Sequence, residues 1–344
     1  MSRGLGDVYK RQSDDRAKVN NATLRNRGWE LSVSWNDKLK CGFSYGIGFN
    51  VFNYKAVVTK YNNPEGIIYN NHTGLAANKG YYEGMDIGEI WGYRADDLFL
   101  SNREIDDYLR NVNLTAFKSN DLWRRGDLKY IDSNGDGRVD GGKGTLADHG
   151  DLQIIGNTTP KYSFGINLNL GYKGFEISTL LQGVAKRDFP ISGSNYMFGG
   201  NNYNFKEHLD YFSTENPNGY LPRLTGWKDD KDFLVNTGYN TTRYLLNAAY
   251  MRMKNLTVGY TFNKKQLRHI GISNLKVYVT CDNLFTVTKL PKQFDPETLN
   301  QVNMSAGGDA QNTAPGLTSP MKQNGNGMVY PMNRNFVFGL DFTF

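Results

Sequence analysis

Large apolar side chains occupy every second position in residues 336–344 at the end of the chain. Because successive side chains of a β-strand point to opposite faces, this segment predicts a strand with one apolar face and one small or polar face. An apolar edge strand is an aggregation hazard in water, but it suits a barrel strand that turns its apolar face to lipid. The apolar positions are Phe336, Phe338, Leu340, Phe342 and Phe344.

The same alternation recurs in several long segments. Some of them exceed the roughly 5–6 residues of a typical strand and match the about 9–11 residues of a tilted membrane strand. Short turns are expected at 36–38 and 173–174, whereas 184–249 and 289–335 are long stretches with little periodicity. Short turns and long loops at opposite ends predict an all-β fold, an antiparallel transmembrane β-barrel with long extracellular loops. The alternating segments are 28–35, 41–51, 162–172, 175–181, 256–262 and 275–287.

Two further patterns refine this prediction. Aromatic residues near strand ends fit the interfacial girdles of a membrane barrel. Residues 101–111 predict a short helix in a loop, and residues 128–131 predict a strand. The girdle candidates are Trp29, Trp35, Tyr54, Tyr172, Tyr260 and Phe262.

The composition agrees with a β protein. The 344 residues include 38 Gly, 22 Tyr and 19 Phe but 10 Pro, which suits many strands with tight turns. The mean hydropathy is −0.59, and no apolar run of about 18 residues exists, which excludes helical membrane spans. The net charge of +6 is scattered along the chain, so we expect no nucleic-acid partner. Cys41 and Cys281 exclude a disulfide framework and are expected to pack as apolar residues.

The segment 1–20 is expected to be a non-native or unstructured leader. It has no apolar core of a signal peptide, and it departs from the pattern that follows. An exported protein without an export signal is expected to be a fragment, so residues 21–344 are interpreted as its folded part.

The sharpest local motif is a calcium-loop pattern that starts at Asp132. Side-chain oxygens recur at loop positions one, three, five and nine, Gly137 at position six permits the turn, and Arg138 at seven offers its carbonyl. Position twelve is Lys143, where a bidentate Glu belongs, so Asp148 or Asp151 would have to supply that carboxylate. The alternative is an Asx-rich turn without metal. The candidate Ca²⁺ ligands are Asp132, Asn134, Asp136, Arg138, Asp140, Asp148 and Asp151.

Motifs of known enzymes are absent from the sequence. It contains no HExxH, GxSxG or Walker loop, and its four histidines are scattered. We therefore expect no catalytic residues. The loop 192–205 combines aromatic rings with amides, which suits sugar or peptide contact, although a solvated loop has the same composition. Its candidate ligand-contact residues are Tyr196, Phe198, Tyr203 and Phe205.

Several motifs, in order, resemble those of SusC/RagA-type TonB-dependent outer-membrane receptors. Residues 126–137 resemble the pattern GD-[IL]-[KR]-[YF]-x-D-x-N-x-DG, and residues 83–93 resemble EG-x-P-x-G-x-x-[FY]-G-[FY], with Met85 in place of the proline. Together the motifs cover nearly everything after residue 20. The other matching segments are 21–31, 155–160, 172–175, 252–260, 283–285, 295–297 and the terminal Phe344.

The resemblance implies a 22-stranded barrel in the outer membrane of a Gram-negative cell. It implies import of oligosaccharides or peptides, energised by TonB and assisted by a SusD-like surface lipoprotein. It also implies that the terminal aromatic strand, residues 336–344, directs barrel assembly. The plug domain and the early strands would be missing, so this chain is expected to hold a partial barrel of about ten to twelve strands.

Two alternatives remain open from the sequence. A soluble, calcium-stabilised glycan-binding β-sandwich would also show alternating strands, but would bury its aromatic faces between two sheets. A surface hydrolase would need two converging carboxylates, for which the sequence offers no characteristic spacing.

Overall fold

The computed structural model describes residues 22–68, 81–191, 206–225, 232, 234–263, 267, 271–299 and 332–343. Three predictions therefore lie outside the described residues. They concern the leader 1–20, the terminal Phe344 and the aromatic loop with Tyr196, Phe198, Tyr203 and Phe205.

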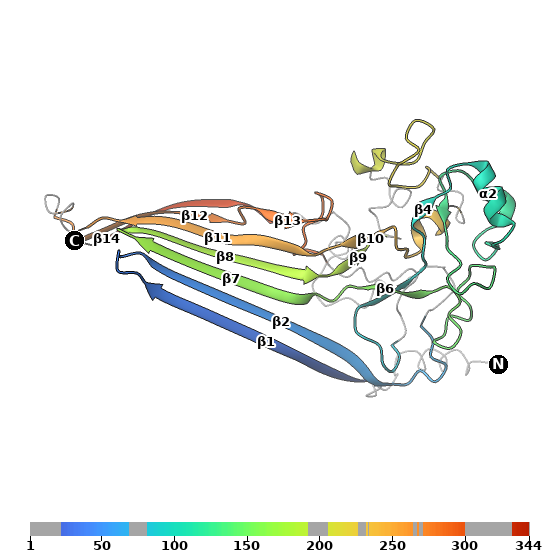
Figure 1. Cartoon of the computed structure of the whole chain (residues 1–344), viewed down its shortest axis with the longest axis horizontal. Coiled ribbons are helices and arrows are strands. Elements are labelled where there is room, and N and C mark those ends of the chain that lie inside the picture. Colours follow the sequence, from blue (N-terminus) through green and yellow to red (C-terminus); the bar gives the residue numbers. More distant parts are fainter. Residues whose placement is uncertain are drawn as a thin grey trace, which may run out of the picture.

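A large antiparallel sheet forms one end of the molecule (Figure 1). It contains eight strands in the order β1-β2-β7-β8-β11-β12-β14, with β13 paired to β11. The path ends at β1 and β14, so the sheet is open, as in a partial barrel. The count of ten to twelve barrel strands applies to the whole chain and stays a prediction. The strands are β1 (Ala22–Lys38), β2 (Ser44–Tyr61), β7 (Lys161–Tyr172), β8 (Phe175–Lys186), β11 (Tyr250–Thr261), β12 (Asn274–Asp282), β13 (Thr286–Thr288) and β14 (Asn335–Thr343).

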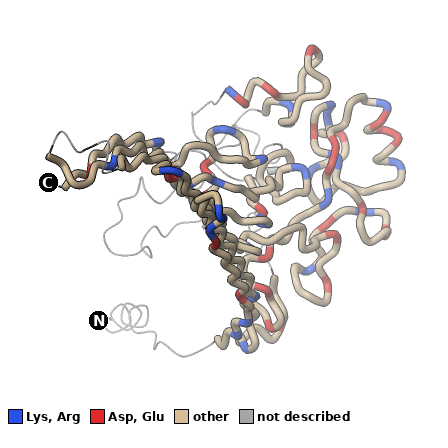
Figure 2. The backbone as a smooth tube through the Cα atoms, turned by 60° about the vertical axis from the view of Figure 1, so that its left-hand side comes forward, with Lys and Arg blue, Asp and Glu red and all other residues tan. Residues whose placement is uncertain are grey.

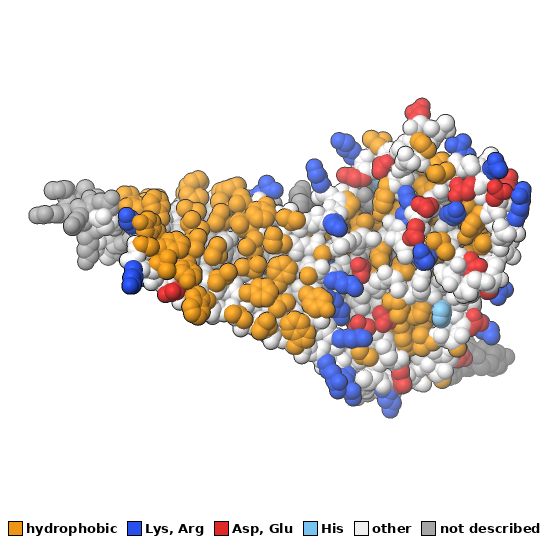
Figure 3. Space-filling view, in the orientation of Figure 1, with side chains coloured by type: hydrophobic (Ala, Val, Ile, Leu, Met, Phe, Trp, Pro, Cys, Tyr) orange, Lys and Arg blue, Asp and Glu red, His pale blue; other side chains and the backbone are white. Residues whose placement is uncertain are grey.

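The outer face of this sheet is apolar. The register places Val33 opposite Phe49, and Leu340 opposite Val277, so large side chains from neighbouring strands share one face. Trp35 is 61% exposed and Phe338 is 80% exposed. Figure 3 shows these side chains as a broad hydrophobic band across the long strands. The terminal strand predicted from residues 336–344 is confirmed as β14 over its described part.

The inner face is lined by small and polar residues. Gly48 and Asn50 of β2 lie opposite Asn167 and Gly165 of β7 on this face. Gly339 is required by packing, because a Cβ there would lie 2.1 Å from the ring of Tyr278. The sandwich alternative is wrong, because the wall is a single curved layer (Figure 2) whose apolar side chains point outward.

The long loops pack together beyond one end of the wall (Figure 1). We call this the loop assembly, and it comprises the described residues of 62–160, 187–249 and 289–299. Its aromatic core includes Tyr130, which is fully buried and stacks on Phe117 with ring centroids 4.3 Å apart. The assembly contains β3 (Glu89–Gly92), β4 (Asp97–Leu98), α2 (Asn102–Leu109), η1 (Asn120–Leu122), β5 (Leu128–Lys129), β6 (Gln153–Asn157), β9 (Asp188–Pro190), η2 (Lys206–Leu209), η3 (Leu234–Gly238) and β10 (Leu245–Asn247).

Three local predictions were wrong. The first turn lies after Lys38, since Asp37 and Lys38 still pair with β2. The predicted strand 275–287 is two strands, because Asn283 takes a left-handed backbone (φ 52°) that Asn tolerates and that interrupts the ladder. Tyr54 lies opposite Gly28 on the inner face and does not join the outer girdle.

The helix predicted at 101–111 is confirmed as α2. Ser101 caps it by accepting the backbone N–H of Glu104 at 3.1 Å. No helix in the described part of the chain is both long enough and apolar enough to cross a membrane. Cys41 is exposed and Cys281 half-buried, and both are free thiols.

Candidate functional site

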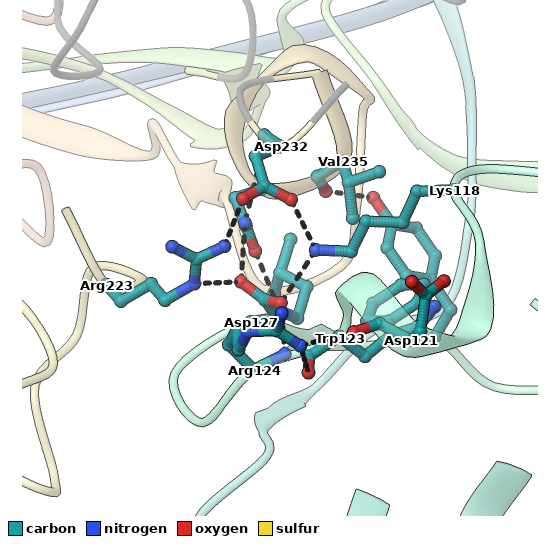
Figure 4. Close-up of polar contacts among 11 residues, drawn as sticks. Lys118, Asp121, Trp123, Arg124, Asp127, Arg223, Asp232 and Val235 are labelled. Carbon is teal, nitrogen blue, oxygen red and sulfur yellow. Dashed lines mark hydrogen bonds and ion pairs between the residues drawn. The ribbon is translucent and has the colours of Figure 1, made fainter. Parts of the chain in front are cut away.

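A buried ionic cluster holds the loop assembly together (Figure 4). The Lys118 Nζ lies 2.7 Å from Asp127 and 2.6 Å from Asp232. Arg223 pairs with the same two carboxylates, its Nε lying 2.6 Å from Asp127. The side chains of Lys118 and Asp127 are fully buried. Two cations and two anions therefore neutralise each other where isolated charges would be strongly disfavoured.

Asp127 is the centre of this cluster. Its carboxylate also accepts the Asn236 amide at 2.9 Å and the Arg124 backbone N–H at 2.8 Å. The preceding Gly126 has φ 87°, and a Cβ there would lie 2.3 Å from the ring of Phe212. The Gly126–Asp127 pair of the sequence motif thus combines close backbone packing with a buried counter-ion.

A second ionic cluster joins the loop assembly to the inner face of the wall. Arg252 of β11 lies 2.7 Å from both Asp295 and Glu297, and Lys254 lies 2.9 Å from Glu297. Arg187 donates to the Leu299 carbonyl at 2.8 Å. Two segments that the sequence showed only as separate motifs, 252–260 and 295–297, are therefore in direct contact.

These ion pairs make the loop assembly sensitive to acid. Burial tends to raise the pKa of Asp232, but hydrogen bonds from Lys118 and Arg223 outweigh it and hold that pKa below its usual range. Burial is likewise outweighed at Asp295, whose pKa is lowered by the Met332 N–H and by Arg252. A lowered folded-state pKa stabilises the fold above the unfolded pKa of about 4, and this stabilisation is lost as the pH falls through the folded value.

We therefore expect protease resistance of the loop assembly to be constant from pH 7 to about 5 and to fall below about pH 4. Limited proteolysis with an acid-stable protease over this range measures it. Resistance that is unchanged down to pH 3 would contradict the role given to these carboxylates.

The structure brings together most of the predicted calcium ligands. Asp132 accepts the backbone N–H groups of Gly135 at 2.6 Å and Gly137 at 2.8 Å. Asp151 reaches the centre of the loop, accepting from Ser133 at 2.6 Å and Asp140 at 3.0 Å. Burial raises the pKa of Asp151, against the lowering effect of these backbone N–H groups.

Other features of this loop weaken its fit to calcium. The Arg138 Nε lies 3.3 Å from Asp136 and 3.2 Å from Asp140, so a guanidinium already faces two candidate carboxylates. Asp148 lies 3.8 Å from Lys143 in a separate turn. Within the described ranges, no group of three or more His, Cys, Asp or Glu is arranged to hold a metal ion. The donors suit Ca²⁺ in kind, whereas their arrangement is that of an Asx-rich turn, and calcium remains a prediction.

A hollow of about 590 Å³ lies near the short-turn end of the wall. Its inner-face residues include Asn36, Ser44, Asn169 and Glu176, and Glu176 pairs with Lys276 at 2.5 Å. Leu170, Ile177 and glycines also line it, so hydroxyl, amide and charged groups of the inner face stand beside apolar surface. The polar groups are those expected on the lumen side of a barrel.

Sequence reasoning missed both ionic clusters. Lys118 and Asp232 are separated by 114 positions, and Arg252 and Asp295 by 43. No spacing rule links residues so far apart. The only available signal was that Asp127, Arg252 and Asp295 each lay within a motif of the family resemblance.

The chain was compared with known proteins, and no protein-family model matches it. It is 25% identical over 324 residues to TonB-dependent receptor P3 of Formosa agariphila, covering 93% of this chain and 29% of that protein. It is 21% identical over 290 residues to TonB-dependent receptor SusC of Bacteroides thetaiotaomicron, covering 83% of this chain and 25% of that protein. The chain is thus similar to TonB-dependent receptors over most of its length. It spans less than a third of the length of these curated relatives.

Solved structures show the same fold as this chain. The RagAB peptide importer in its open-open state matches with a TM-score of 0.56 at 18% identity, covering 94% of this chain and 29% of that one. The closed-closed state gives 0.54 at 19% identity. The open wall described above thus has the architecture of part of a RagA-type barrel.

Proposed function

We propose that this chain forms part of the wall and the extracellular loop assembly of an outer-membrane importer of nutrient oligomers. The observation that carries the proposal is a single β-layer, apolar outside and polar inside, with structured loops beyond one end. A soluble protein would cover the hydrophobic band, whereas lipid covers it in an outer-membrane barrel. The relatedness to TonB-dependent receptors supports the same conclusion.

The cargo and partners follow from the family. We propose that the cargo is an oligosaccharide or a peptide, that TonB supplies the energy, and that a SusD-like lipoprotein works with the receptor. RagAB, whose structure this chain resembles, is a peptide importer, and this supports the peptide option. We propose no catalytic step for this chain, and the relatedness to receptors supports this.

Fractionation and growth test this proposal together. The full receptor should fractionate with the outer membrane, require detergent for extraction and migrate differently before and after heating. A deletion strain should lose growth on one class of oligomer, peptide or glycan, and keep growth on the monomers. A receptor that is fully soluble without detergent, or unchanged growth on every oligomer, would refute it.

We further propose that the loop 132–151 binds Ca²⁺, with Asp132, Asn134, Asp136, Asp140 and the Arg138 carbonyl as its donors and Asp151 in place of the final Glu. On this proposal, millimolar Ca²⁺ protects the loop of the intact receptor from protease, and EGTA reverses the protection.

The Asp132→Asn variant should lose that protection, while the matched Asp106→Asn variant, on the exposed side of α2, should keep it. Equal cleavage with Ca²⁺ and with EGTA would contradict calcium binding, and the loop would then be an Asx-rich turn without metal.

A further inference from the structure

Three basic side chains continue the apolar outer face of β1 and β2 toward the loop end. Residues of β1 alternate between faces, so Arg25 and Arg27 share the face of Trp29. Arg27 lies directly opposite Lys55, and this is the next pair on the same face after Trp29 and Asn53. We call Arg25, Arg27 and Lys55 the rim cations. All three are exposed.

The rim cations have no counter-ion within the described ranges. No ion pair or side-chain hydrogen bond in this part of the chain involves them. Like charges directly opposite each other on neighbouring strands repel and destabilise the pair. An external anion between Arg27 and Lys55 would remove that repulsion.

Their position along the strand is that of a membrane interface. Trp29 contacts Tyr162 with ring centroids 6.5 Å apart, which is an aromatic pair at the edge of the hydrophobic band. Arg27 lies about 27 Å along the strand from Trp35, or about 20 Å along the membrane normal for a typical tilt, near the edge of a band about 25 Å tall. The guanidinium therefore reaches the headgroup region at the loop end.

The same order, exposed apolar side chains followed by a basic side chain, recurs at the other side of the wall. Phe285 and Val287 are exposed on alternate positions, and the next exposed position is Lys289. Figure 3 shows Lys and Arg side chains along the border between the hydrophobic band and the loop assembly. The basic rim is thus not confined to one hairpin.

We propose that the rim cations bind the phosphate groups of lipid headgroups in the outer leaflet of the membrane. A planar guanidinium bonds two phosphate oxygens at once, and a lysine adds a point charge. A membrane surface is the occupant that matches cations directly adjoining an apolar, lipid-facing band. This inference rests on the proposed outer-membrane function.

The test uses the intact receptor, purified in a neutral detergent and delipidated. Binding of bis-phosphorylated lipid A is measured by native mass spectrometry and compared with its dephosphorylated form. The variant R25Q/R27Q/K55Q removes three charges from the rim. The matched control R103Q/R110Q/K143Q removes three charges from exposed sites on the loop assembly.

We expect the unmodified receptor and the control to prefer the phosphorylated lipid, and the rim variant to bind it at least about 10-fold less well. Equal binding by the rim variant and the control would overturn the proposal. A rim variant that loses a co-purifying lipoprotein but keeps the lipid would overturn it too, because the cations would then serve a protein partner.

The readouts separate this inference from the proposed function. If the rim variant fails to assemble, the unmodified receptor still decides, since its preference for phosphate should weaken as salt is raised. If the receptor is heat-modifiable and extracted from the membrane but does not prefer the phosphorylated lipid, this inference is wrong and the proposed function is unaffected. A receptor that is not in the membrane sinks the proposed function.

Discussion

Replacing Asp127 with alanine is expected to destabilise the loop assembly by about 3–5 kcal/mol. The substitution removes one of the two carboxylates that Lys118 and Arg223 share, so two cations face Asp232 alone, and the Lys118 side chain is fully buried. Asn236 and the Arg124 N–H also lose their acceptor. The expected result is local unfolding around 118–130 and 223–236, with the wall intact.

Hydrogen exchange in the intact, detergent-solubilised receptor measures this effect. The backbone amides of Leu128 and Tyr130 should exchange far faster in Asp127→Ala. The control is Asp106→Ala, which removes an exposed carboxylate from α2 and should change stability by no more than about 0.5 kcal/mol. Similar exchange in the two variants would show that the cluster does not hold the assembly.

The apolar face of the wall should be equally intolerant of charge. Leu168→Arg, near the middle of β7, is expected to reduce barrel stability by about 2–4 kcal/mol, because it places a guanidinium at mid-depth in the lipid. Leu168 lies on the outer face, opposite Ile47 on β2 and Thr179 on β8.

The neighbouring residue provides the control. Asn169 is on the inner face and lines the hollow near the short turns, so Asn169→Arg should cost less than about 1 kcal/mol. Denaturant unfolding in lipid vesicles, followed by the heat-dependent shift on gels, compares the two variants. Equal losses would contradict a wall with lipid on one side and water on the other.

Both expectations lead to the same view of the molecule. The wall is held by its backbone ladder and, on the proposed function, by lipid around its apolar face. The loop assembly is held by an aromatic core and by two ionic clusters, and Arg252 with Asp295 fastens it to the wall. The acid sensitivity expected for the assembly follows from this division, since the membrane-facing wall depends on apolar contacts and the assembly depends on carboxylates.

The sequence by itself determined the strands and their faces. Phe336, Phe338 and Leu340 alternate with smaller residues, and a strand converts that period of two directly into two faces. This relation is local, so no partner strand is needed to predict it. The break at Asn283 escaped prediction because the alternation continues through it, while the backbone conformation of that residue does not follow from the pattern.

Only the tertiary structure decided which charges meet. Lys118 and Asp127 come from one stretch of the chain, and Arg223 and Asp232 from another, with 96 positions between Asp127 and Arg223. Any of many carboxylates would have suited each cation as well. The same holds for the candidate calcium ligands, where Asp151 turned into the loop and Asp148 paired with Lys143 instead. Coulombic attraction does not depend on sequence separation, so its partners are fixed by how the loops pack.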